Sequence, residues 1–251
     1  MSDNKKVVLV TGGSSGIGFA IAQEFVAIGA QVVITGLYQD ELDVAAGKLG
    51  HGVAAIRANI ADGAEMDAVF AQVAKRHGQL DAVIANAGAI GNAPLGQINE
   101  EHIKFIFGTN INGLVNTVQK ALPLMVAGGS IVVIGSAAAT RPSYGLSVYS
   151  ASKAAMRTLL QTWVFDTRGS GVRINMISPW GVDTPGLRAA LAVEAGPDGV
   201  EAALEYMAKA NPLGRVTQPK DIANVAVYLA SEQASFIHGV DLLVDGGATQ
   251  V

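Results

Sequence analysis

Tyr149, Lys153 and Ser136 are the residues of this chain whose types and spacing best suit proton transfer. Tyr149 and Lys153 are four residues apart, so on a helix their side chains share one face. A free phenol, with a pKa near ~10, exchanges protons poorly at neutral pH, and a neighbouring ammonium group is expected to lower that pKa. The hydroxyl of Ser136 is expected to hold a carbonyl oxygen beside the phenol. These groups suit a reaction in which a proton is transferred while a carrier bound nearby transfers a hydride.

A glycine-rich turn near the N-terminus is the candidate site for such a carrier. A short apolar run ends at Thr11 and is followed by Gly12, Gly13, Ser14, Ser15, Gly16, Ile17 and Gly18. Gly12 suits a tight turn, Gly16 allows the backbone to approach a pyrophosphate, and Gly18 allows close packing of helix on strand. Most dinucleotide-binding folds space these glycines differently, so an ordinary loop between strand and helix remains an alternative at this point.

Short β-rich runs alternate along the chain with longer helical patterns. Strands are expected at residues 7–10, 31–35, 53–57, 81–85, 130–134, 173–177 and 241–244, and helices include residues 17–27, 65–76 and 102–126. This alternation predicts an α/β fold, a Rossmann-type doubly wound parallel seven-stranded sheet with helices on both faces, forming a single domain over residues 1–251. Residues 181–215 interrupt the pattern with glycines and prolines, which predicts a small helical substrate lid.

Composition excludes several classes of function. The 251 residues are 50% hydrophobic, and the net charge of −4 comes without any run of lysine or arginine, so nucleic acid is not an expected partner. No apolar run approaches the length of a membrane span, and we expect a cytoplasmic protein. The absence of cysteine excludes disulfides and thiolate metal sites, and the four histidines have no ligand spacing, so no metal is expected.

Five motifs, in order, resemble those of the short-chain dehydrogenase/reductase family. They are the glycine turn, Asn86-Ala87-Gly88, Asn110, Ser136, and the Tyr149/Lys153 pair. The resemblance implies that Tyr149 is the general acid/base, that Lys153 lowers its pKa and binds the nicotinamide ribose, and that Ser136 orients the substrate oxygen. It also implies that Asn110 holds a water connecting Lys153 to solvent, and that Asn86-Ala87-Gly88 supports the sheet beside the cofactor. Taken singly, Ser136 also fits a strand-end cap, Asn110 a buried helix amide, and Tyr149 an interface aromatic.

The resemblance implies NAD(H) or NADP(H) as cofactor, and the residues after Gly36 bear on the choice. Leu37 and Tyr38 stand where an acidic residue would bind a ribose 2′-hydroxyl or an arginine would bind a 2′-phosphate. Without a cation here, NAD(H) is favoured, although Ser14 or a distant basic side chain remains an alternative phosphate ligand. Asn59 and Ile60 are expected near the adenine, where asparagine still offers an acceptor oxygen.

The segment of Pro179, Trp180, Val182 and Thr184 resembles the turn that the family places beside the nicotinamide. Trp180 occupies the position of a glycine, so its indole either turns into the core or narrows the substrate pocket. The residues expected to line that pocket are Ser136, Ala138, Tyr149, Trp180, Leu187, Leu191 and Tyr206.

The leading function is an alcohol dehydrogenase or carbonyl reductase that interconverts a small or medium, largely apolar ketone and a secondary alcohol. A 3-oxoacyl-[acyl-carrier-protein] reductase is the second hypothesis, although residues 122–130 offer no basic side chain to an acidic carrier protein. The third is a protein that binds the dinucleotide without chemistry, which the presence of Ser136, Tyr149 and Lys153 disfavours. Two helices with wide apolar surfaces, at residues 105–121 and after Tyr149, indicate assembly, and the resemblance implies a homotetramer.

Overall fold

The centre of the protein is a seven-stranded, all-parallel sheet. The computed structural model describes residues 5–50 and 52–250. The strands are β1 (Val7–Thr11), β2 (Gln31–Gly36), β3 (Ala54–Arg57), β4 (Leu80–Ala85), β5 (Met125–Ile134), β6 (Arg173–Pro179) and β7 (Asp241–Val244). They lie in the order β3-β2-β1-β4-β5-β6-β7, with every neighbouring pair parallel. The predicted fold class and all seven predicted strands are confirmed.

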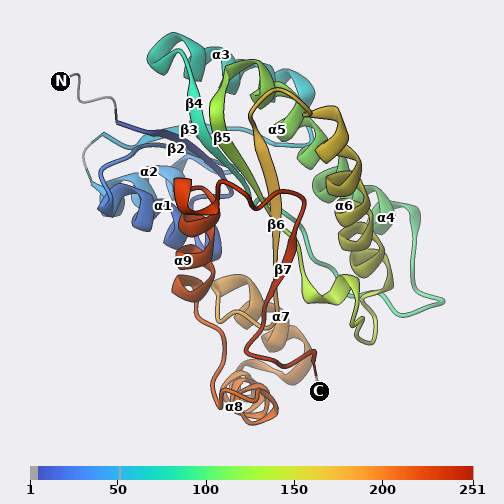
Figure 1. Ribbon diagram of the computed structural model, residues 1–251. Coiled ribbons are helices and arrows are strands. Elements are labelled where there is room, and N and C mark those ends of the chain that lie inside the picture. The colour runs from blue at the N-terminus through green and yellow to red at the C-terminus, as the bar shows by residue number, and fades with distance from the viewer. Residues whose placement is uncertain (1–4, 51, 251) are drawn as a thin grey trace.

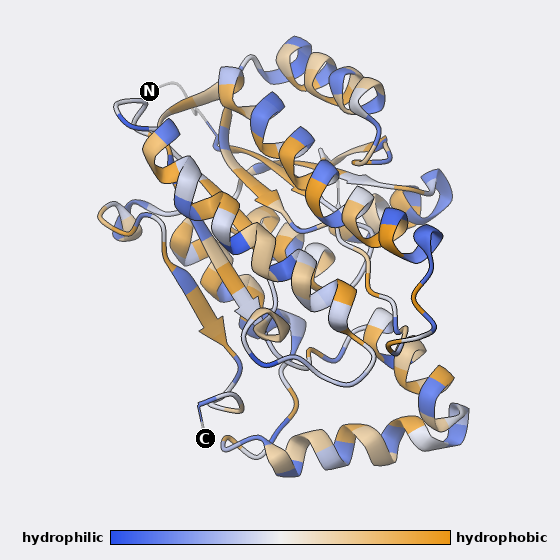
Figure 2. Cartoon of the chain, turned by 90° about the vertical axis from the view of Figure 1, so that its right-hand side faces the viewer, coloured by the Kyte–Doolittle hydropathy of each residue, from blue (hydrophilic) through white to orange (hydrophobic). Residues whose placement is uncertain are grey.

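Helices cover both faces of this sheet (Figure 1). One face packs against α1 (Gly16–Ala27), α2 (Gln39–Leu49) and α9 (Pro219–Leu229), and the other against α3 (Gly63–His77), α5 (Gly113–Ala121) and α6 (Ser147–Asp166). Within β1, Val7 and Leu9 belong to one apolar core while Val8 and Val10 belong to the other. This alternation explains why the central strands are largely apolar, as the mostly orange strands of Figure 2 show, because each central strand is buried on both sides.

The helix predicted over residues 102–126 is wrong in its extent. The structure divides it into α4 (Glu100–Phe107), a π-helical turn (Gly108–Asn112), α5 and a short 3₁₀ turn (Leu122–Leu124), after which β5 begins at Met125. Pro123 has no amide hydrogen with which to continue the helix, so the helical ladder stops here. The π-helical turn matters for the site, because it carries the buried side chain of Asn110.

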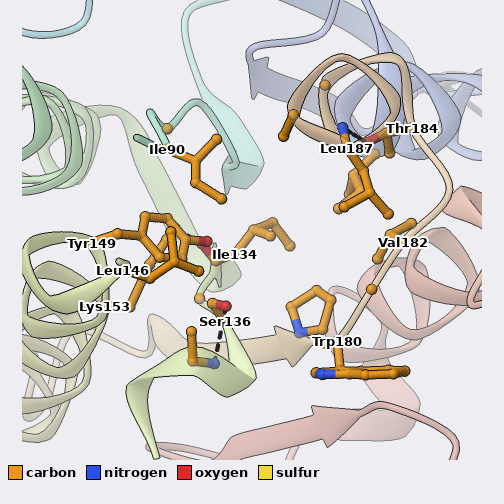
Figure 3. Close-up of a pocket in the computed structure, with 18 of the residues that line it drawn as sticks. Ile90, Ile134, Ser136, Leu146, Tyr149, Lys153, Trp180, Val182, Thr184 and Leu187 are labelled. Carbon is orange, nitrogen blue, oxygen red and sulfur yellow. Dashed lines mark hydrogen bonds between the residues drawn. The ribbon is translucent and has the colours of Figure 1, made fainter. Parts of the chain in front are cut away.

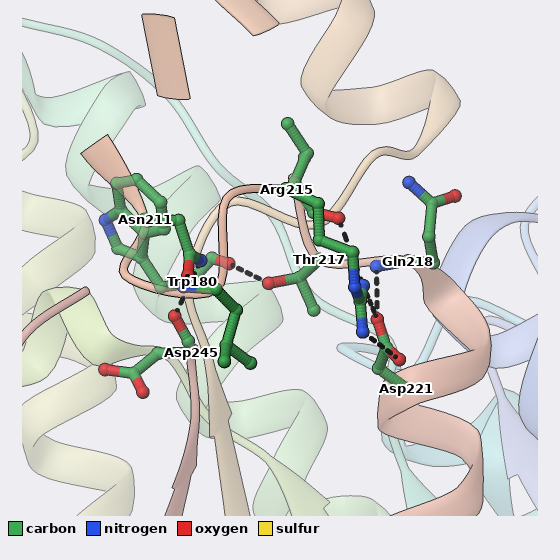
Figure 4. Close-up of polar contacts among 9 residues, drawn as sticks. Trp180, Asn211, Arg215, Thr217, Gln218, Asp221 and Asp245 are labelled. Carbon is green, nitrogen blue, oxygen red and sulfur yellow. Dashed lines mark hydrogen bonds and ion pairs between the residues drawn. The ribbon is translucent and has the colours of Figure 1, made fainter. Parts of the chain in front are cut away.

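The segment predicted as a lid forms α7 (Pro185–Ala195), a 3₁₀ turn (Pro197–Gly199) and α8 (Val200–Ala210), which lie beyond the carboxyl ends of β6 and β7 (Figure 1). Polar contacts hold both of its ends, as Figure 4 shows. The Thr217 hydroxyl donates to the Trp180 carbonyl at 3.0 Å, and the Asn211 amide donates to the Asp245 carbonyl at 3.0 Å. The residues that flank the segment are therefore bonded to each other, and the residue after α8 is bonded to the chain just after β7.

Within residues 5–50 and 52–250, no helix is both long enough and apolar enough to cross a bilayer. The cytoplasmic location expected from the sequence stays a prediction.

Candidate active site

The predicted proton-transfer residues meet in one cavity of about 410 Å³ at the carboxyl ends of the central strands. Ser136 follows β5 and precedes a 3₁₀ turn (Ala137–Ala139), where its hydroxyl accepts from the amide of Ala138 at 3.2 Å. Tyr149 and Lys153 come from the first turns of α6. Figure 3 shows the hydroxyls of Tyr149 and Ser136 directed into the same open space. This arrangement places two hydroxyl groups around one position that a carbonyl oxygen can occupy.

Lys153 is buried, with 4% of its surface exposed, and its ammonium donates to the Ile134 carbonyl at 3.0 Å. Its Nζ lies 5.8 Å from the centroid of the Tyr149 ring. Burial lowers the pKa of Lys153 to about 8. Burial also raises the pKa of Tyr149, and the hydrogen bond from the Ser136 hydroxyl opposes that rise. The expectation of a lowered phenol pKa is therefore wrong in direction, because desolvation of the phenolate outweighs the groups that stabilise it.

The lowered pKa of Lys153 predicts a pH-dependent stability. An unfolded chain keeps the proton up to the ordinary lysine pKa of 10.5, whereas the folded protein releases it near 8. Between these values the unfolded state binds more protons, so the free energy of unfolding should rise with pH. The expected gain is on the order of a few kcal/mol. Urea unfolding across this pH window should show the rise in wild type and a flatter profile in Lys153→Met.

A matched control separates this effect from the other groups that titrate above pH 8. Lys48 lies exposed near the end of α2, so Lys48→Met removes one ammonium from the surface. Lys48→Met should keep the wild-type slope. An identical slope in wild type and Lys153→Met would contradict the assigned burial cost of the Lys153 charge.

The glycine turn has the geometry that dinucleotide binding requires. Gly12 and Gly16 adopt φ angles of +65° and +54°, which favour glycine. A Cβ on Gly18 would lie 2.1 Å from the carbonyl oxygen of Gly12, so only glycine permits this packing of α1 on the turn. Asn86, after β4, donates from its side chain to the carbonyls of Thr11 and Gly12 at 2.9 and 3.1 Å. The turn is thus held by α1 on one side and by Asn86 on the other, and its glycines leave the backbone uncovered by side chains.

Beside this turn lies a second cavity of about 390 Å³. Its lining includes most of the predicted cofactor residues: Gly12, Ser14, Ser15, Gly16, Ile17, Leu37, Tyr38, Asn59, Ile60, Asn86, Ala87, Gly88 and Thr184. Pro179, Trp180 and Val182 line the cavity of Tyr149 instead. The bare glycine backbone and the N-terminus of α1 fit a pyrophosphate, so the residues present suit a nicotinamide dinucleotide.

Some predicted residues occupy other positions than expected. Asn110 lines neither cavity, since its amide donates to the Ala89 carbonyl and the Ser152 hydroxyl, both at 2.9 Å, while its oxygen accepts from the Ala89 amide. Leu191 and Tyr206 are absent from the lining of the catalytic cavity, and Tyr206 is 75% exposed. The prediction of these two as pocket residues is wrong, because helix phase turns Ala190 and Met207 inward in their place.

Trp180 lines the catalytic cavity and is only partly buried. The alternative in which the indole packs inside the core is therefore wrong. Two further charged residues line the cavities without having been predicted, Arg141 at the catalytic cavity and Glu41 at the other. Both lie in polar stretches without a distinctive motif, so no pattern in the sequence indicates them.

Known proteins match this chain in sequence and in fold over nearly its whole length. A protein-family model described as "Enoyl-(Acyl carrier protein) reductase" matches residues 12–249. Oxidoreductase asL5 of Sarocladium schorii is 41% identical over 248 residues, 98% of this chain and 96% of that protein. A crystal structure from Brucella melitensis, described as a short-chain dehydrogenase/reductase and glucose/ribitol dehydrogenase, superposes with a TM-score of 0.89 at 30% identity, covering 98% of this chain and 96% of that one.

The chain belongs to the short-chain dehydrogenase/reductase family. A further solved structure, 3-ketoacyl-(acyl-carrier-protein) reductase from Brucella melitensis, is a complex with NADH. It superposes with a TM-score of 0.86 at 28% identity and covers 98% of this chain and all of its own. Membership of the short-chain dehydrogenase/reductase family makes the chain an oxidoreductase of the kind that binds NAD(P)(H).

Proposed function

We propose that this protein uses NAD(H) to interconvert a secondary alcohol and a ketone, with Tyr149 as the acid/base. The observation that carries the proposal is the continuity of the two cavities. Ile17, Asn86, Gly88, Thr184 and Gly186 line both of them. A dinucleotide that follows the glycine turn through this shared wall reaches the hydroxyls of Tyr149 and Ser136. Those hydroxyls are therefore in place for the proton transfer that accompanies hydride transfer.

In the reductive direction, a nicotinamide held by the residues that line both cavities would supply a hydride to the carbonyl carbon. The electron pair of the carbonyl π bond then moves to oxygen, and Tyr149 gives that oxygen its proton. The Ser136 hydroxyl donates a hydrogen bond to the same oxygen and stabilises the charge that develops there. Lys153, fixed by Ile134, places a cation behind the phenol and favours the phenolate left after transfer. Oxidation of the alcohol reverses these steps.

The cavity favours a substrate of small or medium size with an apolar body. Leu146, Leu187, Met207 and Trp180 bring apolar surface to the space in front of the two hydroxyls. A spectrophotometric panel tests the function: NADH and NADPH oxidation followed with aliphatic, aryl and diketone substrates. Turnover of at least one ketone class that depends on Tyr149 supports the proposal, and dinucleotide binding without any turnover overturns it.

A 3-oxoacyl-carrier-protein reductase is a second candidate, since a structural relative and the matching family model both carry acyl-carrier names. The argument against it is that residues 122–130 have no basic side chain for an acidic carrier. Rates on acyl-carrier substrates far above those on free ketones would reverse this ranking.

Glu41 supports the preference for NAD(H). Its carboxylate lies 3.5 Å from the Ser14 hydroxyl of the glycine turn. That hydroxyl lies beside Gly36, so Glu41 in the first turn of α2 is close to the end of β2. The lining of this cavity, within the described part of the chain, contains Glu41 and no lysine, arginine or histidine. A carboxylate there accepts from a ribose 2′-hydroxyl and repels a 2′-phosphate. Glu41 thus supplies the acidic group that Leu37 and Tyr38 lack.

Neutralising Glu41 should therefore narrow the preference between the two dinucleotides. We expect Glu41→Gln to tighten NADPH binding by about tenfold and to weaken NADH binding, as when about 1.4 kcal/mol of charge repulsion is removed. Fluorescence titration of both reduced dinucleotides measures this. Asp40→Asn is the control, because Asp40 is exposed on the same helix and lines neither cavity. Equal shifts in the two variants would refute a local role for Glu41.

We also propose that the protein assembles through α4, α5 and α6. Large apolar side chains are exposed on this side: Ile103 at 43%, Phe105 at 58% and Phe165 at 69%. An assembly covers such a surface, in agreement with the homotetramer expected from the sequence.

A further inference from the structure

The charges around the catalytic cavity are one-sided. Lys153 and Arg141 are among its lining residues, and within residues 5–50 and 52–250 no aspartate or glutamate joins them. The whole chain has a net charge of −4. A cavity with cations only, in a protein with an excess of acidic groups, attracts a negatively charged ligand.

Arg141 is the cation at this cavity that is open to a ligand. Lys153 is buried against the Ile134 carbonyl behind the phenol. Arg188, on the neighbouring helix α7, is already occupied: its guanidinium pairs with Asp183 at 2.6 Å and with Glu201 at 2.5 Å. Arg141 is exposed at the cavity rim, and within the described part of the chain it forms no ion pair.

The backbone at Arg141 is fixed relative to Ser136. The amide of Arg141 donates to the Ala137 carbonyl at 2.9 Å, and the Thr140 hydroxyl donates to the same carbonyl at 3.2 Å. This compact turn begins at Ser136, whose hydroxyl is the proposed anchor for the reacting oxygen. The backbone that carries the guanidinium is therefore fixed relative to Ser136. Such an arrangement suits the recognition of two polar groups on one substrate molecule.

We propose that the substrate is a keto acid or the matching hydroxy acid, whose carboxylate binds Arg141 while its ketone lies between Ser136 and Tyr149. This inference rests on the proposed function and adds the substrate class. A guanidinium offers a carboxylate two parallel hydrogen bonds, which positions as well as attracts it. The apolar side chains of Leu146, Leu187 and Met207 are left to contact the carbon skeleton between the two polar ends.

The test is a series of keto acids with increasing separation of ketone and carboxylate, each compared with its neutral methyl ester. Wild type should show a KM about tenfold or more lower for the best acid than for its ester, as expected of a charge-assisted hydrogen bond. Arg141→Gln should abolish that difference by raising KM for the acid, with kcat little changed, and Arg141→Lys should restore part of it. Arg168→Gln is the control, since Arg168 is exposed and lies outside both cavities.

A binding measurement keeps the inference testable without turnover. Aliphatic carboxylates and the corresponding primary alcohols are titrated into the protein–NADH complex, with nicotinamide fluorescence as the readout. Tighter binding of the carboxylates in wild type, lost in Arg141→Gln and kept in Arg168→Gln, supports the inference. Equal binding of acids and neutral analogues, or equal losses for both in Arg141→Gln, overturns it. Turnover of neutral ketones alone would refute the keto acid but not the proposed function, whereas failure to bind either dinucleotide would refute the proposed function itself.

Discussion

Replacing Tyr149 with phenylalanine should lower kcat for ketone reduction by about 10²–10⁴-fold, the usual contribution of a positioned acid/base. Only the hydroxyl is removed, and the ring keeps its packing on α6. Because the glycine-turn cavity lies outside this change, the dissociation constant for NADH should stay close to that of wild type. Initial rates with saturating NADH and a fluorescence titration of the same preparations measure both quantities.

Tyr228→Phe is the matched control for the loss of a phenolic hydroxyl. Tyr228 lies on α9, is 42% exposed and lines neither cavity. This variant should retain wild-type rates. Rates near wild type in Tyr149→Phe would disprove the proton-transfer role, and a comparable loss in Tyr228→Phe would show that the assay reports on folding instead.

Adding one methyl group at Gly18 should disrupt the dinucleotide cavity. A Cβ there would lie 2.1 Å from the Gly12 carbonyl oxygen and 2.5 Å from the Asn86 amide nitrogen. To relieve that overlap, α1 has to move away from the turn or Asn86 has to release it. We expect Gly18→Ala to lower the free energy of unfolding by about 1–3 kcal/mol or more. The accompanying loss of NADH binding should be detectable by fluorescence titration.

The same substitution at Gly47 should have the opposite effect. Gly47 is exposed inside helix α2, and a Cβ there would meet no atom within 4 Å. Alanine is a better helix former than glycine, so Gly47→Ala should raise the free energy of unfolding by about 0.5–1 kcal/mol. Urea unfolding of both variants provides the comparison. Wild-type stability together with wild-type NADH affinity in Gly18→Ala would contradict the packing described for the turn.

Local patterns were enough to predict the sheet, the glycine turn and the meeting of Ser136 with Tyr149. Strand–helix alternation reports burial on both faces of each strand, and parallel strands bring their carboxyl ends to one edge, where Ser136 and the turn lie. The limits of the helix around Asn110 were harder to predict, because a π-helical turn keeps the apolar periodicity while shifting its phase.

Charged groups that act across cavities were not predictable from patterns. The roles proposed for Glu41 and Arg141 depend on the cavities that they line, and each lies in an ordinary polar stretch of sequence. The pKa of Tyr149 shows the same limit, since helical spacing placed Lys153 nearby but said nothing about the burial that raises that pKa. Leu191 and Tyr206 were assigned by apolar character, whereas the facing of α7 and α8 decides which side chains reach the cavity.

The two cavities are lined largely by different parts of the chain, and this determines what a crossover between two homologous genes would exchange. Residues that line only the dinucleotide cavity occur up to Ala87, with Thr109 as the one exception among them, and residues that line only the catalytic cavity begin at Ala89. Glu41 and Arg141 lie on opposite sides of that boundary. A single crossover near codon 88 would therefore exchange the coenzyme preference between two homologous genes while each substrate pocket was inherited almost intact.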